Sequence, residues 1–150
     1  MITFATHGLI TGERGAAAPG LVLTPPEVPT LEDDGLLTSA EIATLTLSAR
    51  LVVLSACNTA AGEAPGQEGL SGLAGSFFHA GARALLVTHW SVYSDASARI
   101  ASGLVGRLAA DPAKGNAAAL RDTVLDVIDG ATRPLERHPS YWAPFAVIGA

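Results

Sequence analysis

The sequence predicts an α/β domain built on a mostly parallel sheet that is covered on both faces. Two apolar runs, at 49–57 and 83–90, are too short for helices and show no polar alternation, which is typical of strands buried on both faces. Helical patterns alternate with the strands along the chain, as in parallel α/β architectures. Because 150 residues accommodate one core and little else, residues 1–150 are interpreted as a single domain.

The first part of the chain predicts short strands. The segment 2–7, ITFATH, has β-branched and aromatic character, and it is expected to be a strand whose carboxyl end carries His7, just before Gly8. A stretch rich in glycine and proline follows. Within it, residues 21–24 and 35–37 predict a small surface hairpin.

Two helices are predicted from local signals at their ends. Thr38 and Glu41 have the spacing of a capping box, which indicates a helix at about 39–46. Residues 70–80 also have a helical pattern. They end at Gly81, which suits a left-handed residue after a helix.

Two longer amphipathic helices and a last strand complete the domain. The helices are expected at about 95–110 and 117–129, with Asp95 and Asn116 at their N-caps, and FAVI at 145–148 is a short strand. Apolar residues recur at every fourth position of each helix: Ile100, Leu104 and Leu108 in the first, and Leu120, Val124 and Ile128 in the second.

Composition excludes several classes of function. The net charge is −5 and the 9 basic residues are scattered singly, so we expect neither nucleic acid nor an anionic membrane as a partner. No apolar run approaches the roughly 18 residues that span a bilayer, and the N-terminal segment lacks the features of a signal peptide. The single cysteine, Cys57, excludes an internal disulfide and fits a reducing compartment, so a soluble cytoplasmic protein is expected.

The candidate chemistry lies where two predicted strands end. In open α/β sheets, sites form beyond the carboxyl ends of the strands, and His7 and Cys57 both stand there. If these strands are neighbours, the imidazole can take the thiol proton, and the backbone N–H groups of Gly8 and Cys57 can hold an oxyanion. The alternative interpretation of the same residues is a buried structural cysteine and a surface histidine.

Other motifs give no competing site. The glycines of GLSGLAG at 69–75 do not have dinucleotide-binding spacing, and Ser71 is not in a G-x-S-x-G elbow. The remaining histidines show no metal-ligand spacing, so no metal site is expected. Trp90 ends a predicted strand on the same rim and is a candidate for lining a pocket.

Five segments together resemble the CHAT domain. They are FATHG at 4–8, LLTSAEI at 36–42, LVVLSACNTAAGE at 51–63, GLAGSFFHAGARALLVTHW at 72–90 and HPSYWAPFAVIG at 138–149. CHAT domains are members of the caspase–separase clan of cysteine peptidases. The resemblance covers nearly the whole chain, and it implies a three-layer, caspase-like α/β fold with a mostly parallel sheet.

The resemblance implies a cysteine endopeptidase that cleaves protein substrates through a thioester, without metal or organic cofactor. By motif, the catalytic histidine is His7 and the nucleophile is Cys57. The residue two before the nucleophile, acidic or Gln in several relatives, is the neutral Ser55. Ser94 stands at the usual acidic position after the tryptophan, so a preference for basic substrate residues depends on Asp95, which follows it. Ser55, Trp90 and Asp95 are expected near the substrate pocket.

The sequence departs from the family pattern at its N-terminal end. In this fold the histidine strand is internal, whereas here it begins at residue 2. We therefore expect a domain that lacks its first strands, with the histidine strand as an open sheet edge. The helical TPR region of many CHAT proteins is also absent. A missing N-terminal half or a TPR-containing regulatory region is an expected partner, and the alternative function is a catalytically incompetent fragment that acts as a protein-interaction module.

Overall fold

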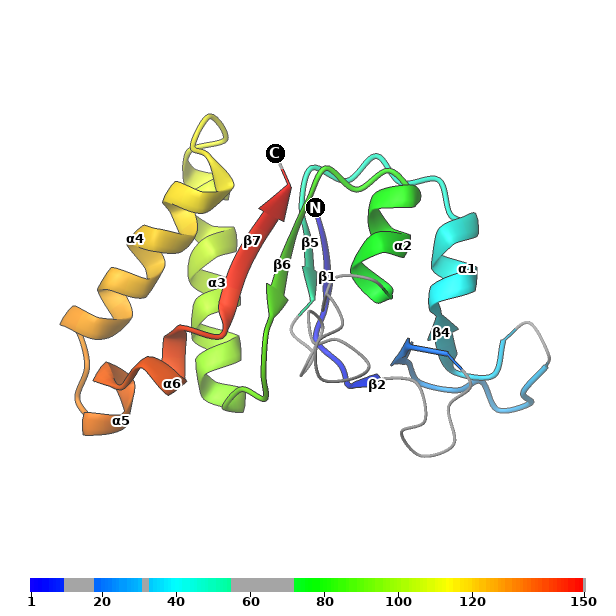
Figure 1. Ribbon diagram of the computed structural model, residues 1–150, viewed down its shortest axis with the longest axis horizontal. Coiled ribbons are helices and arrows are strands. Elements are labelled where there is room, and N and C mark those ends of the chain that lie inside the picture. Colours follow the sequence, from blue (N-terminus) through cyan, green and yellow to red (C-terminus); the bar gives the residue numbers. More distant parts are fainter. Residues whose placement is uncertain (10–17, 31–32, 55–71, 150) are drawn as a thin grey trace.

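Figure 1 shows the computed structural model of the chain, which describes residues 1–9, 18–30, 33–54 and 72–149. The elements are, in chain order, β1 (Ile2–Phe4), β2 (Gly8–Leu9), β3 (Gly20–Val22), β4 (Leu36–Thr38), α1 (Ser39–Thr44), β5 (Val52–Leu54), α2 (Leu73–His79), β6 (Ala84–Thr88), α3 (Ser94–Ala110), α4 (Asn116–Asp129), α5 (Pro134–Arg137), α6 (Pro139–Trp142) and β7 (Phe145–Gly149).

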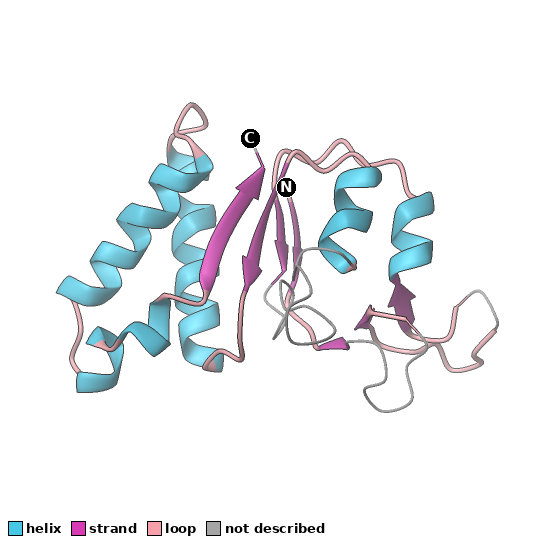
Figure 2. Cartoon of the chain, viewed as in Figure 1, coloured by secondary structure: helices cyan, strands magenta, loops and turns pink. Residues whose placement is uncertain are grey.

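The main sheet has the strand order β1-β5-β6-β7. β1, β5 and β6 run parallel, and β7 is antiparallel to β6. In Figures 1 and 2, α1 and α2 lie on one side of this sheet and α3 and α4 on the other. The prediction of a mixed α/β chain with a mostly parallel sheet is therefore confirmed.

Alternate residues of β5 point into two separate cores. Val53 packs in the core that includes α3 and α4. Val52 and Leu54 pack on the opposite face, with residues of α1 and α2. Phe4 of β1 joins this second core, where its ring centroid lies 5.5 Å from that of Phe77. Burial on both faces explains why the β5 segment is apolar without alternation.

A second, smaller sheet follows β1. Its order is β2-β3-β4, and the antiparallel pairing of β3 with β4 confirms the predicted hairpin. The strand predicted at 2–7 is too long, since β1 ends at Phe4. The chain turns there because the residues that follow pair elsewhere: Val22 N–H donates to the carbonyl oxygen of His7 at 2.9 Å, and Gly8 lies opposite Leu21.

The predicted signals at the helix ends are confirmed in part. The Thr38–Glu41 capping box is present, with Glu41 N–H 3.3 Å from Thr38 Oγ1. The predicted N-caps of the two long helices are wrong. Tyr93 and Gly115 occupy those positions, so Asp95 and Asn116 lie within the first turns of α3 and α4.

The apolar face of α3 is as predicted, whereas that of α4 is rotated. Ile100, Leu104 and Leu108 are all buried. In α4 the buried residues are Ala119, Leu120, Thr123 and Val127, while Val124 and Ile128 are half-buried. The close approach of α4 to α3 explains the difference, because a Cβ placed on Gly103 would stand 2.6 Å from the Thr123 methyl group.

Gly81 is expected to be essential to the stability of the domain. Its φ of +103° is left-handed, and an added Cβ would stand 2.5 Å from the carbonyl oxygen of Leu47. Gly81→Ala should therefore lower the free energy of unfolding by about 2 kcal/mol or more, measured by urea denaturation. Gly106 of α3 is the matched control, since open space surrounds it and alanine there should stabilise by up to about 1 kcal/mol. Equal urea midpoints for the two variants would contradict this reasoning.

Candidate functional site

The carboxyl ends of the parallel strands form one rim of the main sheet. Phe4 of β1 lies directly beside Leu54 of β5, in parallel register, and β6 continues the sheet beyond β5. His7 follows Phe4 by three residues. Ser55 and Cys57 follow β5 and lie outside the described residues, so the pairing of His7 with Cys57 stays a prediction.

His7 is held at this rim by the small sheet. Its carbonyl oxygen accepts the Val22 N–H bond, and the hydroxyl of the preceding Thr6 donates to the carbonyl oxygen of Val22. The imidazole itself is exposed. The backbone is therefore fixed on one side while the ring is open to solvent.

The backbone N–H of Gly8 points away from the small sheet. Because Val22 N–H bonds to His7, Gly8 and Leu21 form a non-hydrogen-bonded pair of the antiparallel ladder. The N–H and C=O of Gly8 then face the side opposite β3. The Gly8 N–H therefore makes no hydrogen bond to β3.

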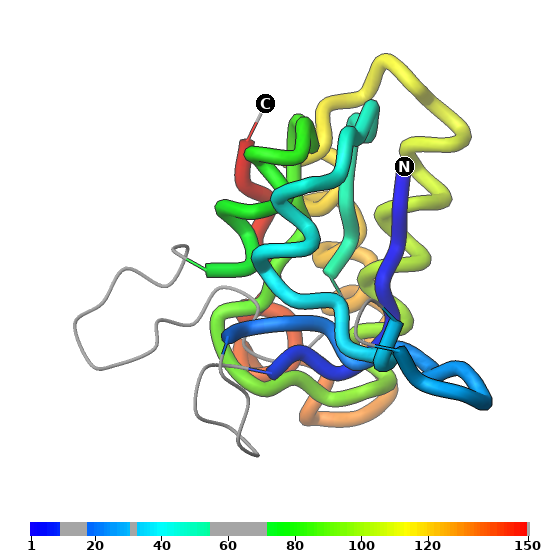
Figure 3. Tube along the Cα trace, turned by 90° about the vertical axis from the view of Figure 1, so that its right-hand side faces the viewer, coloured from blue at the N-terminus to red at the C-terminus, as the bar shows by residue number. Residues whose placement is uncertain are grey.

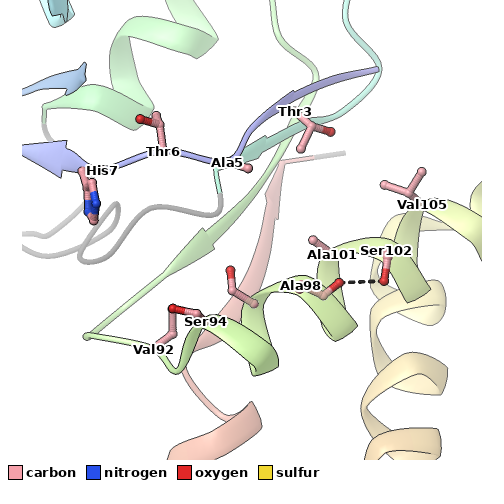
Figure 4. Close-up of a pocket in the computed structure, with 11 residues that line it drawn as sticks. Thr3, Ala5, Thr6, His7, Val92, Ser94, Ala98, Ala101, Ser102 and Val105 are labelled. Atoms are coloured by element: carbon pink, nitrogen blue, oxygen red, sulfur yellow. Dashed lines mark hydrogen bonds between the residues drawn. The ribbon is translucent and has the colours of Figure 1, made fainter. Parts of the chain in front are cut away.

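A cavity of about 550 Å³ lies next to His7, between β1 and α3. Figure 4 shows Thr3, Ala5 and His7 on one side of it, and the helix residues Ala98 and Ala101 on the other. Its full lining is Thr3, Ala5, Thr6, His7, Val92, Ser94, Ser97, Ala98, Ala101, Ser102 and Val105. Sequence reasoning missed this cavity, because it depends on how a strand and a distant helix pack.

Two other predicted pocket residues lie outside the lining of this cavity. Trp90, two residues beyond β6, is 44% exposed. Asp95 accepts hydrogen bonds from Arg133 and, at 3.1 Å, from the Tyr141 hydroxyl. The Arg133 bond holds the pKa of Asp95 below its ordinary value, against a smaller opposing effect of desolvation. A basic substrate residue would have to share this carboxylate with Arg133, so the role of Asp95 in specificity stays a prediction.

A buried carboxylate beside Asp95 was not expected from the sequence. Glu136 is 4% exposed and accepts backbone N–H groups of Arg133 at 3.0 Å and Thr132 at 2.7 Å. These backbone bonds are the main cause that lowers its pKa to about 2. Arg99 of α3 adds an ion pair at 2.8 Å. The cluster ties α5 to the first turns of α3.

The described residues contain no group of three or more His, Cys, Asp or Glu side chains that could hold a metal ion. Among the helices of the described ranges, none is long and apolar enough to cross a membrane.

Comparisons with known proteins identify a family model and a relative that this chain resembles. The model of the CHAT domain matches residues 1–150. Tetratricopeptide repeat protein 28 of Mus musculus is 35% identical over 119 residues, and the match covers 77% of this chain. The match spans 4% of the length of that mouse protein.

Proposed function

Because the CHAT domain model matches all of residues 1–150, the chain belongs to the CHAT family, and from this premise we propose that it is a cysteine endopeptidase acting on protein substrates. Cys57 is the nucleophile and His7 the general base in this proposal. The observation that supports it is the pairing of Phe4 with Leu54 on adjacent parallel strands. His7 and Cys57 each follow these paired residues by three positions.

The proposed reaction proceeds through a thioester. His7 takes the proton of the Cys57 thiol, and the thiolate attacks the carbonyl carbon of the scissile peptide bond. The N–H groups of Gly8 and Cys57 hold the developing oxyanion, a role that suits Gly8 because its N–H points away from β3. The leaving amine takes the proton from His7, and water then hydrolyses the thioester. The proposal needs no cofactor and no metal.

The fold that we propose with this activity is the three-layer, caspase-like one, formed by residues 1–150 as a single domain. Helices on both faces of a mostly parallel sheet support it. Ser55, Trp90 and Asp95 are proposed to lie near the bound substrate. A lone cysteine suits a reducing compartment such as the cytoplasm, where a free thiol persists.

The pH dependence of Cys57 alkylation tests whether the pair is assembled. In the purified chain we expect a thiol pKa below the unperturbed value of about 8.5, and a rise toward that value in His7→Ala. His79→Ala is the matched control, because His79 ends α2 at the opposite end of the sheet from His7. Identical titration of the thiol in all three proteins would overturn the proposed dyad.

A second candidate is an interaction module without catalysis. Two observations favour it: β1 is the outermost strand of the main sheet among the described residues, and the matched part of the mouse relative is 4% of a protein named for its tetratricopeptide repeats. In this case the partner is a TPR-containing region or a further part of the domain. An ordinary, alkylation-resistant thiol together with partner binding would favour this candidate over the peptidase.

A further inference from the structure

The loop 89–93 joins β6 to α3 at the rim formed by the carboxyl ends of the parallel strands. Figures 1 and 3 show it at the lower end of the molecule, the end at which α5 and α6 also lie. At the start of the loop, His89 N–H donates to the carbonyl oxygen of Pro144 at 3.0 Å, which extends the pairing of β6 with β7 by one residue. The direction in which the chain leaves β6 is therefore set by the residue just before β7.

The other end of the loop rests on a buried tyrosine. The ring of Tyr93 stacks on that of Tyr141 of α6, with the ring centroids 6.0 Å apart and an angle of 23° between the planes. Tyr141 is fully buried, and its hydroxyl donates to Asp95 of α3 at 3.1 Å, so both its ring and its hydroxyl are held in place. Tyr93 itself is 45% exposed. The Tyr141 ring is therefore a rigid platform for a side chain whose remaining surface is open to solvent.

Trp90 lies between these two anchors of the loop. It is 44% exposed, although tryptophan side chains are on average highly buried. Val92, in the same loop, packs instead against the core that includes α3 and α4. β6 is the neighbour of β5, the strand that Cys57 follows by three residues. An exposed indole on this rim suits a contact with a bound ligand, because ligands of open α/β sheets bind beyond the carboxyl ends of the strands.

We propose that Tyr93 is a positioning residue: its ring, stacked on Tyr141, fixes the loop 89–93 so that the Trp90 indole forms a wall of the substrate site. The role of this wall rests on the proposed peptidase activity, whereas the ordering of Trp90 by Tyr93 is a property of the folded chain alone. Ordering the indole before the substrate arrives avoids the entropic cost of fixing it during binding. The benefit is therefore expected in substrate affinity rather than in the chemical step.

The alternative role of Tyr93 is to stabilise α3, and one substitution separates the two roles. Tyr93 is the N-cap of α3, but its side chain makes no capping hydrogen bond to the described first turn. Serine is among the favoured N-cap residues, because its hydroxyl accepts a backbone N–H of the first turn. Tyr93→Ser therefore removes the stacked ring while adding a helix cap. Tyr93→Phe keeps the ring and is the matched control.

The fluorescence of Trp90 tests the ordering of the loop. The chain has 2 tryptophans, so Trp142→Phe leaves Trp90 as the sole reporter, and time-resolved anisotropy then measures the nanosecond motion of its indole. In this background we expect the amplitude of that motion to rise about twofold or more in Tyr93→Ser and to stay unchanged in Tyr93→Phe. Equal amplitudes in the background chain and both variants overturn the proposal.

Peptide hydrolysis by the chain with both tryptophans tests the consequence for substrate binding. Tyr93→Ser should raise KM roughly threefold to tenfold, with little change in kcat or in the melting temperature, while Tyr93→Phe keeps the wild-type KM. A fall of kcat together with the melting temperature in Tyr93→Ser would show a merely structural role and overturns the proposal. If the wild-type chain cleaves no peptide, the peptidase proposal fails, and the anisotropy alone upholds or overturns the ordering of Trp90 by Tyr93.

Discussion

Replacing His7 by alanine is expected to lower the rate of peptide-bond hydrolysis roughly 10³-fold, and replacing Cys57 by alanine to abolish it. Without His7 the thiol is mostly protonated at neutral pH and the leaving amine receives no proton, and general acid–base catalysis is worth about 10² to 10⁴ in rate. Without Cys57 no thioester forms. The measurement is cleavage of an unfolded protein and of a peptide library, followed by mass spectrometry of the products.

Two controls make this result specific. His79→Ala should retain full activity, and the double variant lacking both His7 and Cys57 should be no worse than the Cys57 variant, because the two groups act as one unit. Library products that end equally often in arginine and in alanine would remove the proposed specificity role of Asp95. Unchanged cleavage by His7→Ala would contradict the dyad itself.

Replacing Glu136 by glutamine is expected to produce the largest loss of stability by a single isosteric change. Glu136 is buried and forms ion pairs with Arg99 and Arg133. Glutamine removes the negative charge of these pairs but leaves both guanidinium groups in place. We expect the melting temperature to fall by roughly 5 to 10 °C. Glu27→Gln, at an exposed position, is the control and should leave the melting temperature unchanged.

The same carboxylate gives the stability a defined dependence on pH. Its pKa of about 2 in the folded state lies below the ordinary value of 4.5, so the ionised form is favoured by folding. Its contribution is therefore full above about pH 4.5 and is lost as the pH falls toward 2. Melting curves between pH 6 and 2.5 should show the difference between wild type and Glu136→Gln shrinking over that range. A constant difference would contradict the assigned cause.

The features that sequence reasoning predicted correctly are those set by neighbours in the chain. The Thr38–Glu41 capping box and the buried face of α3 depend on residues three or four apart, and both are present. The apolar runs of β5 and β6 correctly predicted burial on both faces, because consecutive residues of a strand point to opposite faces. Local patterns therefore sufficed for the fold class and for most of the elements.

The features that it missed depend on partners far along the chain. β1 is shorter than predicted because Val22, fifteen residues away, takes the backbone of His7. Asp95 is not the helix cap, because α3 begins at Ser94, and its carboxylate accepts hydrogen bonds from the distant Arg133 and Tyr141. The cavity beside His7 arises from the packing of β1 against α3. The position of His7 near a strand end was readable from the sequence, while its contact with Cys57 stays a prediction.

The attachment of His7 to the small sheet means that different strands position the two residues of the proposed dyad. The residue proposed as base is seated by β3, through Val22, whereas the strand that leads to the proposed nucleophile is clamped between the two helical layers. Leu21 of β3 nevertheless packs in the same core as Val52 and Leu54 of β5, so the packing of this core couples the two positions. A substitution that shortens Leu21 is therefore expected to disturb the alignment of the proposed dyad and the stability of the core together.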